Sequence, residues 1–167
     1  MITIDHVPEG IDGILLTYGR PFDDEGELDP GWYARETAVF TLPVTLRLSW
    51  NPAQHVARFR AHKLVGEAMK DAIMSIAAFY GPDFHRLDLD MFGGCFNFRS
   101  MRGGHNLSTH AWGIAIDYLP ELGKLGSTED AQNYPQHVRE AFEERGFVWG
   151  GNWERPDAMH FQACKGY

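Results

Sequence analysis

Residues 108–118, Ser-Thr-His-Ala-Trp-Gly-Ile-Ala-Ile-Asp-Tyr, place His110 and Asp117 seven positions apart on either side of a Trp-Gly pair. Side chains seven positions apart on one continuous strand point to opposite faces, so both reach one ion only if the chain bends between them. The serine and threonine before His110, and Gly113 after it, are compatible with a turn, whereas residues 114–118 are typical of a strand. The stretch therefore predicts a turn that leads into a strand.

Alternation along this strand separates a large apolar face from a face of small residues. The apolar face carries Ile114, Ile116 and Tyr118. Asp117 lies on the other face, where its neighbours are a glycine and an alanine. Small neighbours leave space around the carboxylate, which favours a metal cleft over an ordinary core strand.

Residues 157–162, Asp-Ala-Met-His-Phe-Gln, supply a third candidate ligand. Met159 and Phe161 alternate with His160, so the imidazole can face the cleft while its neighbours enter the core. Asp157 follows a proline at the turn before this strand, so its carboxylate can lie near a metal without binding it. Two histidines and one carboxylate leave a fourth tetrahedral position for water, as in catalytic zinc sites, and a nearby carboxylate suits a general base.

The pattern S-x-H-x-x-G-x-A-x-D, followed by W-G-G-x-W and D-x-M-H-F, resembles the VanY-like zinc D-Ala-D-Ala peptidases over about residues 91–163. That group includes phage L-alanyl-D-glutamate endopeptidases and shares its fold with the Hedgehog signalling domain. The resemblance implies a zinc ion held by His110, Asp117 and His160, with Asp157 as the general base.

The resemblance also implies an arginine shortly before the Ser-x-His sequence that binds the substrate and the oxyanion. Arg99 matches that place best, and Arg102 is the alternative. Ser108 and Trp153 join Arg102 as the expected substrate-binding residues. The family usually has an acidic residue two positions after the last histidine, where this chain has Gln162. An amide oxygen still accepts the imidazole N–H, but it polarises the ligand less than a carboxylate does.

The remaining sequence predicts an α+β fold, with an antiparallel sheet and helices packed on one side, like that of the Hedgehog and D-Ala-D-Ala peptidase group. The predicted elements are strands over 42–50, 91–98 and 147–149, and helices over 53–80 and 129–145. The Gly93-Gly94 pair indicates a bulge or a close approach. His55 and His62 fall on one face of the first helix and are expected to be solvated. His105 is expected at the cleft rim or in solvent.

Length and composition bound the remaining possibilities. The 167 residues form a single predicted domain, in which residues 1–50 are an N-terminal extension packed on the motifs of 91–163. The net charge of -8 argues against a nucleic-acid partner. No stretch approaches the ~20 apolar residues of a spanning helix, so no membrane partner is expected. The two cysteines are too few for a disulfide scaffold, and buried thiols are expected.

These observations predict a zinc metallopeptidase that acts on the stem peptide of peptidoglycan. The favoured form is a phage-type endolysin that cuts an L-Ala-D-Glu or D-Ala-D-Ala bond. Because the first ten residues lack a secretory signal, we expect synthesis in the cytoplasm and release to the cell wall at lysis. A cytoplasmic D-Ala-D-Ala dipeptidase or carboxypeptidase is the alternative enzyme. A non-catalytic zinc-binding module is the other alternative, and Asp157 argues against it because a structural site does not need a carboxylate beside its ligands.

Overall fold

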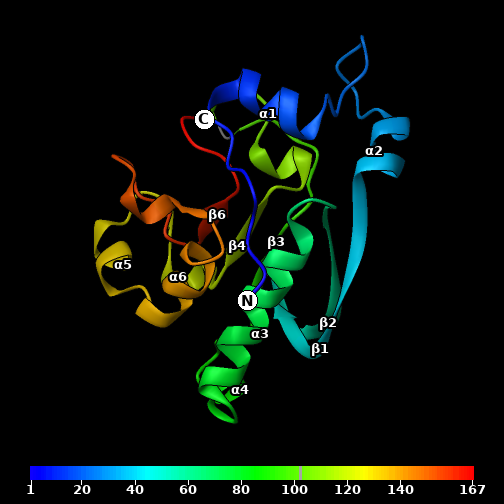
Figure 1. The fold of residues 1–167 in the computed structure, drawn as a ribbon. Helices are drawn as coiled ribbons and strands as arrows, with labels where there is room; N and C mark the ends of the chain where they lie inside the picture. The colour runs from blue at the N-terminus through cyan, green and yellow to red at the C-terminus, as the bar shows by residue number, and fades with distance from the viewer. Residues whose placement is uncertain (102) are drawn as a thin grey trace.

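A mixed sheet with the strand order β2-β1-β3-β4-β6-β5 forms the centre of the computed structural model, which describes residues 1–101 and 103–167 (Figure 1). The strands are β1 (Thr37–Leu48), β2 (Asn51–His62), β3 (Met91–Gly94), β4 (Ala115–Tyr118), β5 (Val148–Trp149) and β6 (His160–Gln162). The helices are α1 (Gly10–Tyr18), α2 (Pro30–Glu36), α3 (Gly66–Tyr80), α4 (Asp83–Arg86), α5 (Thr128–Asn133) and α6 (Gln136–Glu143). Short 3-10 turns are η1 (Thr109–Trp112), η2 (Pro120–Leu122) and η3 (Gly150–Asn152).

The α+β prediction is confirmed, but the prediction of a purely antiparallel sheet is wrong for one pair of strands. β1 and β3 are parallel, whereas β1–β2, β3–β4, β4–β6 and β5–β6 are antiparallel. The chain leaves β2, passes through α3 and α4, and returns beside β1. β3 thus lies on the side of β1 opposite to β2, and a pair of parallel strands of this kind needs a long connection, because a tight hairpin can join only antiparallel ones.

The helix predicted over 53–80 is wrong in its first half. Residues 51–62 form β2, which pairs with β1 from Thr37↔His62 to Leu48↔Asn51, and the helix begins only at Gly66. A side chain at Gly66 would collide with the Phe40 ring of β1, so glycine permits the close approach of α3 to the hairpin. His62 is therefore buried in a strand rather than solvated on a helix.

The helix predicted over 129–145 is divided into α5 and α6. Pro135 lies directly before Gln136, where α6 begins. Proline lacks the backbone N–H that a continuous helix needs and restricts the residue before it to extended backbone. Tyr134 is extended, as this rule requires.

The predicted strand over 91–98 ends at Gly94, and the expectation for its two glycines is confirmed. The register against β4 shifts between Phe92 and Gly94, which is a bulge. A Cβ atom on Gly93 would lie only 2.8 Å from the Asp117 Cβ atom, so the two strands also approach closely. The absence of a side chain at Gly93 thus leaves room for Asp117.

Strand alternation places the core on one face of the sheet and the candidate ligands on the other. Phe142 of α6 stacks on Phe161 at a ring distance of 4.3 Å and contacts Tyr118. α3 packs against both β1 and α6 (Figure 1). Asp117 and His160, each next in sequence to one of these core aromatics, point away from α6.

The N-terminal residues join this same core. Ile14, Tyr18 and Trp32 are buried in one apolar cluster with the sheet. The Tyr18 hydroxyl donates a 2.8 Å hydrogen bond to the Ala163 carbonyl, and the Trp112 indole donates to the Gly19 carbonyl. Residues 1–50 therefore contact the segments that carry the candidate ligands.

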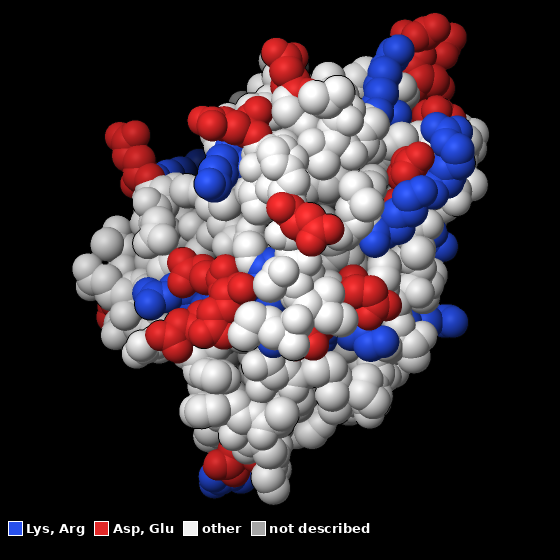
Figure 2. All heavy atoms as spheres, viewed as in Figure 1, with Lys and Arg blue, Asp and Glu red and all other residues white. Residues whose placement is uncertain are grey.

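Part of the negative charge lies on the loop between α1 and α2, at the upper right of the molecule (Figure 2). The carboxylate of Asp23 accepts hydrogen bonds there from the backbone N–H groups of Glu25 and Glu27. Both cysteines are buried free thiols, as expected. Within the described part of the chain, no helix combines the length and apolar character needed to cross a bilayer.

Candidate metal centre

The predicted bend between His110 and Asp117 is a single 3-10 turn. η1 carries His110, and the Ser108 hydroxyl accepts the His110 backbone N–H at its start. Gly113 follows with a left-handed φ of 68°, and a Cβ atom there would lie 2.9 Å from the backbone nitrogen of His62. Glycine is the residue that tolerates both conditions, so it turns the chain into β4, where Asp117 lies.

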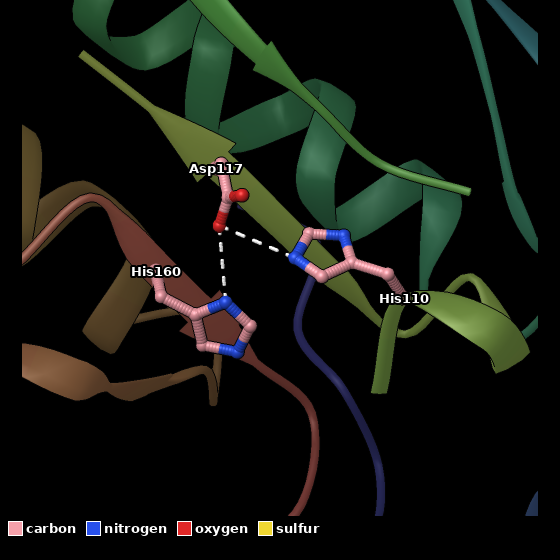
Figure 3. Close-up of side chains that lie close together, drawn as sticks. All are labelled: His110, Asp117 and His160. Atoms are coloured by element: carbon pink, nitrogen blue, oxygen red, sulfur yellow. Dashed lines mark hydrogen bonds and ion pairs between the residues drawn. The ribbon is translucent and has the colours of Figure 1, made fainter. Parts of the chain in front are cut away.

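Three predicted ligands converge at this point (Figure 3). The Asp117 Oδ1 atom lies 3.2 Å from His110 Nε2 and 3.0 Å from His160 Nδ1. One ligand atom from each residue lies within 4.8 Å of the others. The three side chains come from η1, β4 and β6, and β4 and β6 are paired with Asp117 opposite His160.

Outer hydrogen bonds fix which nitrogen of each histidine faces the centre. His110 Nδ1 lies 2.6 Å from the Cys95 carbonyl oxygen, which can only accept, so Nδ1 carries the proton. His160 Nε2 lies 3.0 Å from Gln162 Oε1 and donates to it in the same way. His110 Nε2 and His160 Nδ1 are therefore the nitrogens that face Asp117, and they are the atoms that would bind a metal ion there.

The amide of Gln162 is itself oriented by its surroundings. Its Nε2 atom donates to the carbonyls of Cys164, at 3.2 Å, and Tyr167, at 3.3 Å. The Thr109 hydroxyl donates to Oε1 at 3.2 Å. Because the NH₂ group faces two carbonyls, the amide oxygen must face His160.

The electrostatics of the cluster favour a cation. Burial would raise the pKa of Asp117, but hydrogen bonds from His110 and His160 outweigh it and hold that pKa well below its usual range. Burial lowers the pKa of His160, whereas the hydrogen bond to Asp117 and the charges of Asp117 and Asp157 raise it, with a net rise. The space between the carboxylate and the two imidazole nitrogens therefore favours positive charge, either as protons on these nitrogens or as a metal ion that replaces them.

Two neutral imidazoles and one carboxylate match the ligand preferences of zinc, and both imidazoles have the second hydrogen bond typical of zinc-bound histidine. His110 Nε2, His160 Nδ1 and Asp117 would hold the ion. The donor set is thus consistent with the predicted zinc.

A cavity of about 240 Å³ opens beside the cluster and is lined by most of the predicted site residues. Asp157 lines it, and its charge contributes to the raised pKa of His160. The Trp153 ring lies 5.4 Å from the His160 ring. Arg99 and Ser108 also line the cavity, and the Arg99 carbonyl accepts the Ser108 N–H at 2.9 Å.

Two other predicted positions are Arg102 and His105. Arg102, the alternative to Arg99, lies outside the described residues. His105 is exposed and is not part of the cavity lining, in agreement with the expectation of a rim or solvent position.

Among the described residues, the sequence did not point to four polar groups at the site. Thr109, Arg155 and Tyr167 line the cavity, and the Cys95 carbonyl holds His110. Thr109 lies next to a predicted ligand, so its proximity was a usable signal. The Cys95 contact has no signal of that kind, because every residue carries the same backbone carbonyl.

A two-histidine, one-carboxylate cluster beside a cavity in an α+β fold defines a candidate hydrolytic metal centre. Residues 102–163 match the model of a peptidase M15 family described as D-alanyl-D-alanine carboxypeptidase. The match includes all three candidate ligands and Asp157. It supports the predicted resemblance to the zinc peptidases of this family. No curated protein and no solved structure matches the chain significantly.

Proposed function

We propose that this protein is a zinc metallopeptidase that hydrolyses a peptide bond beside a D-amino acid in the peptidoglycan stem peptide. The observation that carries the proposal is the convergence of the His110 Nε2 and His160 Nδ1 atoms on Asp117, beside a cavity. The family match to D-alanyl-D-alanine carboxypeptidases supports the substrate class. When bound at such a centre, zinc acts as a Lewis acid and lowers the pKa of a water ligand to about 7.

Asp157 is the proposed general base. It lines the cavity and lies close enough to His160 for its charge to affect that pKa, but it is not part of the ligand cluster. Its backbone is fixed by the Asp157 N–H to Gly150 carbonyl bond of 2.9 Å. A carboxylate in this place accepts the proton of the attacking water and later delivers it to the leaving amine.

Arg99 is the proposed substrate and oxyanion residue. It lines the cavity together with His110 and Asp117, and the bond between its carbonyl and the Ser108 N–H ties it to the turn that carries His110. A guanidinium is planar and presents several N–H donors, so it suits either a substrate carboxylate or a developing oxyanion.

Within this class, we favour a phage-type endolysin that cuts an L-Ala-D-Glu or D-Ala-D-Ala bond over a dipeptidase or carboxypeptidase. The test is incubation of the zinc-loaded protein with purified peptidoglycan, followed by mass spectrometry of the soluble products. Release of stem-peptide fragments supports the proposal, and the fragment masses identify the bond. A protein that binds zinc and releases nothing would be the non-catalytic module of the same fold.

A further inference from the structure

A second cavity, of about 360 Å³, adjoins the candidate metal centre. Its described lining residues are Trp50, Gly93, Gly94, Cys95, Phe96, Asn97, Arg99, His110 and Asp117. Among the lining residues described for the two cavities, Arg99, His110 and Asp117 are common to both. The candidate centre therefore lies where the two cavities meet.

Trp50 is the most unusual residue of this second cavity. It lies at the turn between β1 and β2 and is 64% exposed, whereas Trp32, Trp112 and Trp149 are buried. An indole offers a large rigid apolar surface at little entropic cost, and such residues often dominate ligand contacts. Trp50 also lies outside residues 102–163, so the family match does not account for it.

The edge of β3 lies beside Trp50. Pairing between β1 and β3 ends at Leu48↔Phe92, because β1 then turns toward β2. Beyond that point Gly94 pairs with Asp117 of β4. A Cβ atom on Gly94 would meet nothing within 4 Å, so the backbone there borders open space. A strand edge beside a cavity is a common place for an extended peptide to add as a further strand.

We propose that this second cavity, the Trp50 subsite, holds an extended peptide segment of the substrate on one side of the hydrolysed bond. The first cavity, beside Trp153 and Asp157, then holds the segment on the other side. This inference rests on the proposed function and makes it more specific. A cleft that continues past the metal ligands in two directions fits an internal peptide bond better than the removal of one terminal residue.

The first measurement is direct binding, which does not depend on turnover. The zinc-loaded protein, with nitrogen-15 in its tryptophan indoles, is titrated with synthetic L-Ala-γ-D-Glu-L-Lys-D-Ala-D-Ala, and Trp50→Phe assigns the Trp50 indole resonance. We expect that resonance to shift with the peptide and to stay fixed with the glycan disaccharide of peptidoglycan. Mass spectrometry of the same samples records cleavage.

The second measurement is kinetic. Trp50→Ala is expected to raise KM for the peptide by about fivefold to tenfold while kcat and zinc content stay unchanged. Phe79→Ala is the matched control, because Phe79 is also 64% exposed but lies on α3 and lines neither cavity. It should change neither KM nor kcat.

The outcomes separate this inference from the proposed function. A shift of the Trp50 resonance by the peptide without cleavage supports the subsite and rejects the peptidase. Cleavage with an unmoved Trp50 resonance and an unchanged KM in Trp50→Ala supports the peptidase and rejects the subsite. A shift caused only by the disaccharide also rejects it in favour of a sugar contact. If the peptide is neither bound nor cut, both proposals are wrong.

Discussion

Gln162 fixes the tautomer of His160. Its Oε1 atom accepts from His160 Nε2 at 3.0 Å, while its own NH₂ group donates to the carbonyls of Cys164 and Tyr167. The resemblance to zinc D-Ala-D-Ala peptidases predicts a carboxylate in this place. Here a carboxylate would meet two carbonyl oxygens that need donors, so an amide suits the local hydrogen bonds better.

Gln162→Leu is therefore expected to lower zinc affinity by about 10–100-fold, because His160 loses the acceptor that holds its Nδ1 lone pair toward Asp117. Gln162→Glu keeps an acceptor and should keep zinc, but it should unfold at a lower temperature. Chelator competition and thermal unfolding measure the two effects. Wild-type zinc affinity in Gln162→Leu would contradict this role.

Alanine at any of His110, Asp117 or His160 is expected to abolish stoichiometric zinc binding, because only two ligand atoms of the cluster would remain. Elemental analysis of the purified variants measures this. His105→Ala is the control, because His105 is exposed and outside the cluster, and it should retain one zinc per chain. Full zinc content in all three ligand variants would reject the site.

Asp157→Asn is expected to keep both zinc and fold while hydrolysis falls by about 10²–10⁴-fold, because asparagine has the same shape but accepts no proton. Zinc analysis and turnover on the same preparation measure this. Near-normal hydrolysis would mean that Asp157 only shapes the turn before β6. Loss of zinc would make Asp157 a ligand instead.

Arg99→Ala is expected to leave zinc content intact and to lower turnover by about 10²–10³-fold, the usual effect of removing one oxyanion donor. The comparison is Arg102→Ala, assayed on the same peptide substrate. A large loss in Arg102→Ala together with a small loss in Arg99→Ala would assign the role to Arg102.

Acid should destabilise the fold through His62. Burial lowers the pKa of His62 from 6.5 to about 4, although its hydrogen bond to the Tyr18 carbonyl opposes the shift. Between pH 4 and pH 6.5 the unfolded chain therefore binds a proton at His62 more readily than the folded chain does. The contribution of His62 to stability is complete above pH 6.5 and is lost as the pH falls toward 4. Moving from pH 7 to pH 5 should lower the free energy of unfolding by about 2 kcal/mol from this group.

Urea unfolding at the two pH values measures this loss, and His62→Gln, which does not titrate, is the control. The wild type should lose about 2 kcal/mol more than the variant does over the same interval. Equal losses in the two proteins would show that His62 is not the cause.

Local patterns in the sequence were enough to predict that His110, Asp117 and His160 lie together. The alternation of Ile116 and Asp117, and of Phe161 and His160, follows from strand geometry and needs no knowledge of distant contacts. The two glycines at 93 and 94 likewise predicted the bulge and the close approach that make room for Asp117.

The misassigned elements depend on contacts between segments that are distant in sequence. Residues 53–62 carry apolar side chains at spacings that also fit a helix, and their pairing with β1 decides for a strand. The parallel contact between β1 and β3 depends on the path of α3 and α4, which no local pattern specifies. The cavity beside Trp50 was not predicted for the same reason, because Gly93 and Asp117, which line it, come from other strands.

The three candidate ligands are seven and forty-three positions apart along the chain, and in the folded protein the pairing of β4 with β6 places Asp117 opposite His160. A bound ion would act as a crosslink that the unfolded chain cannot form. Each tenfold rise in free zinc above the dissociation constant would then add about 1.4 kcal/mol to the free energy of unfolding. The persistence of the folded protein would in this way follow the zinc supply of its surroundings, and a chelator would shorten its lifetime as well as stop its chemistry.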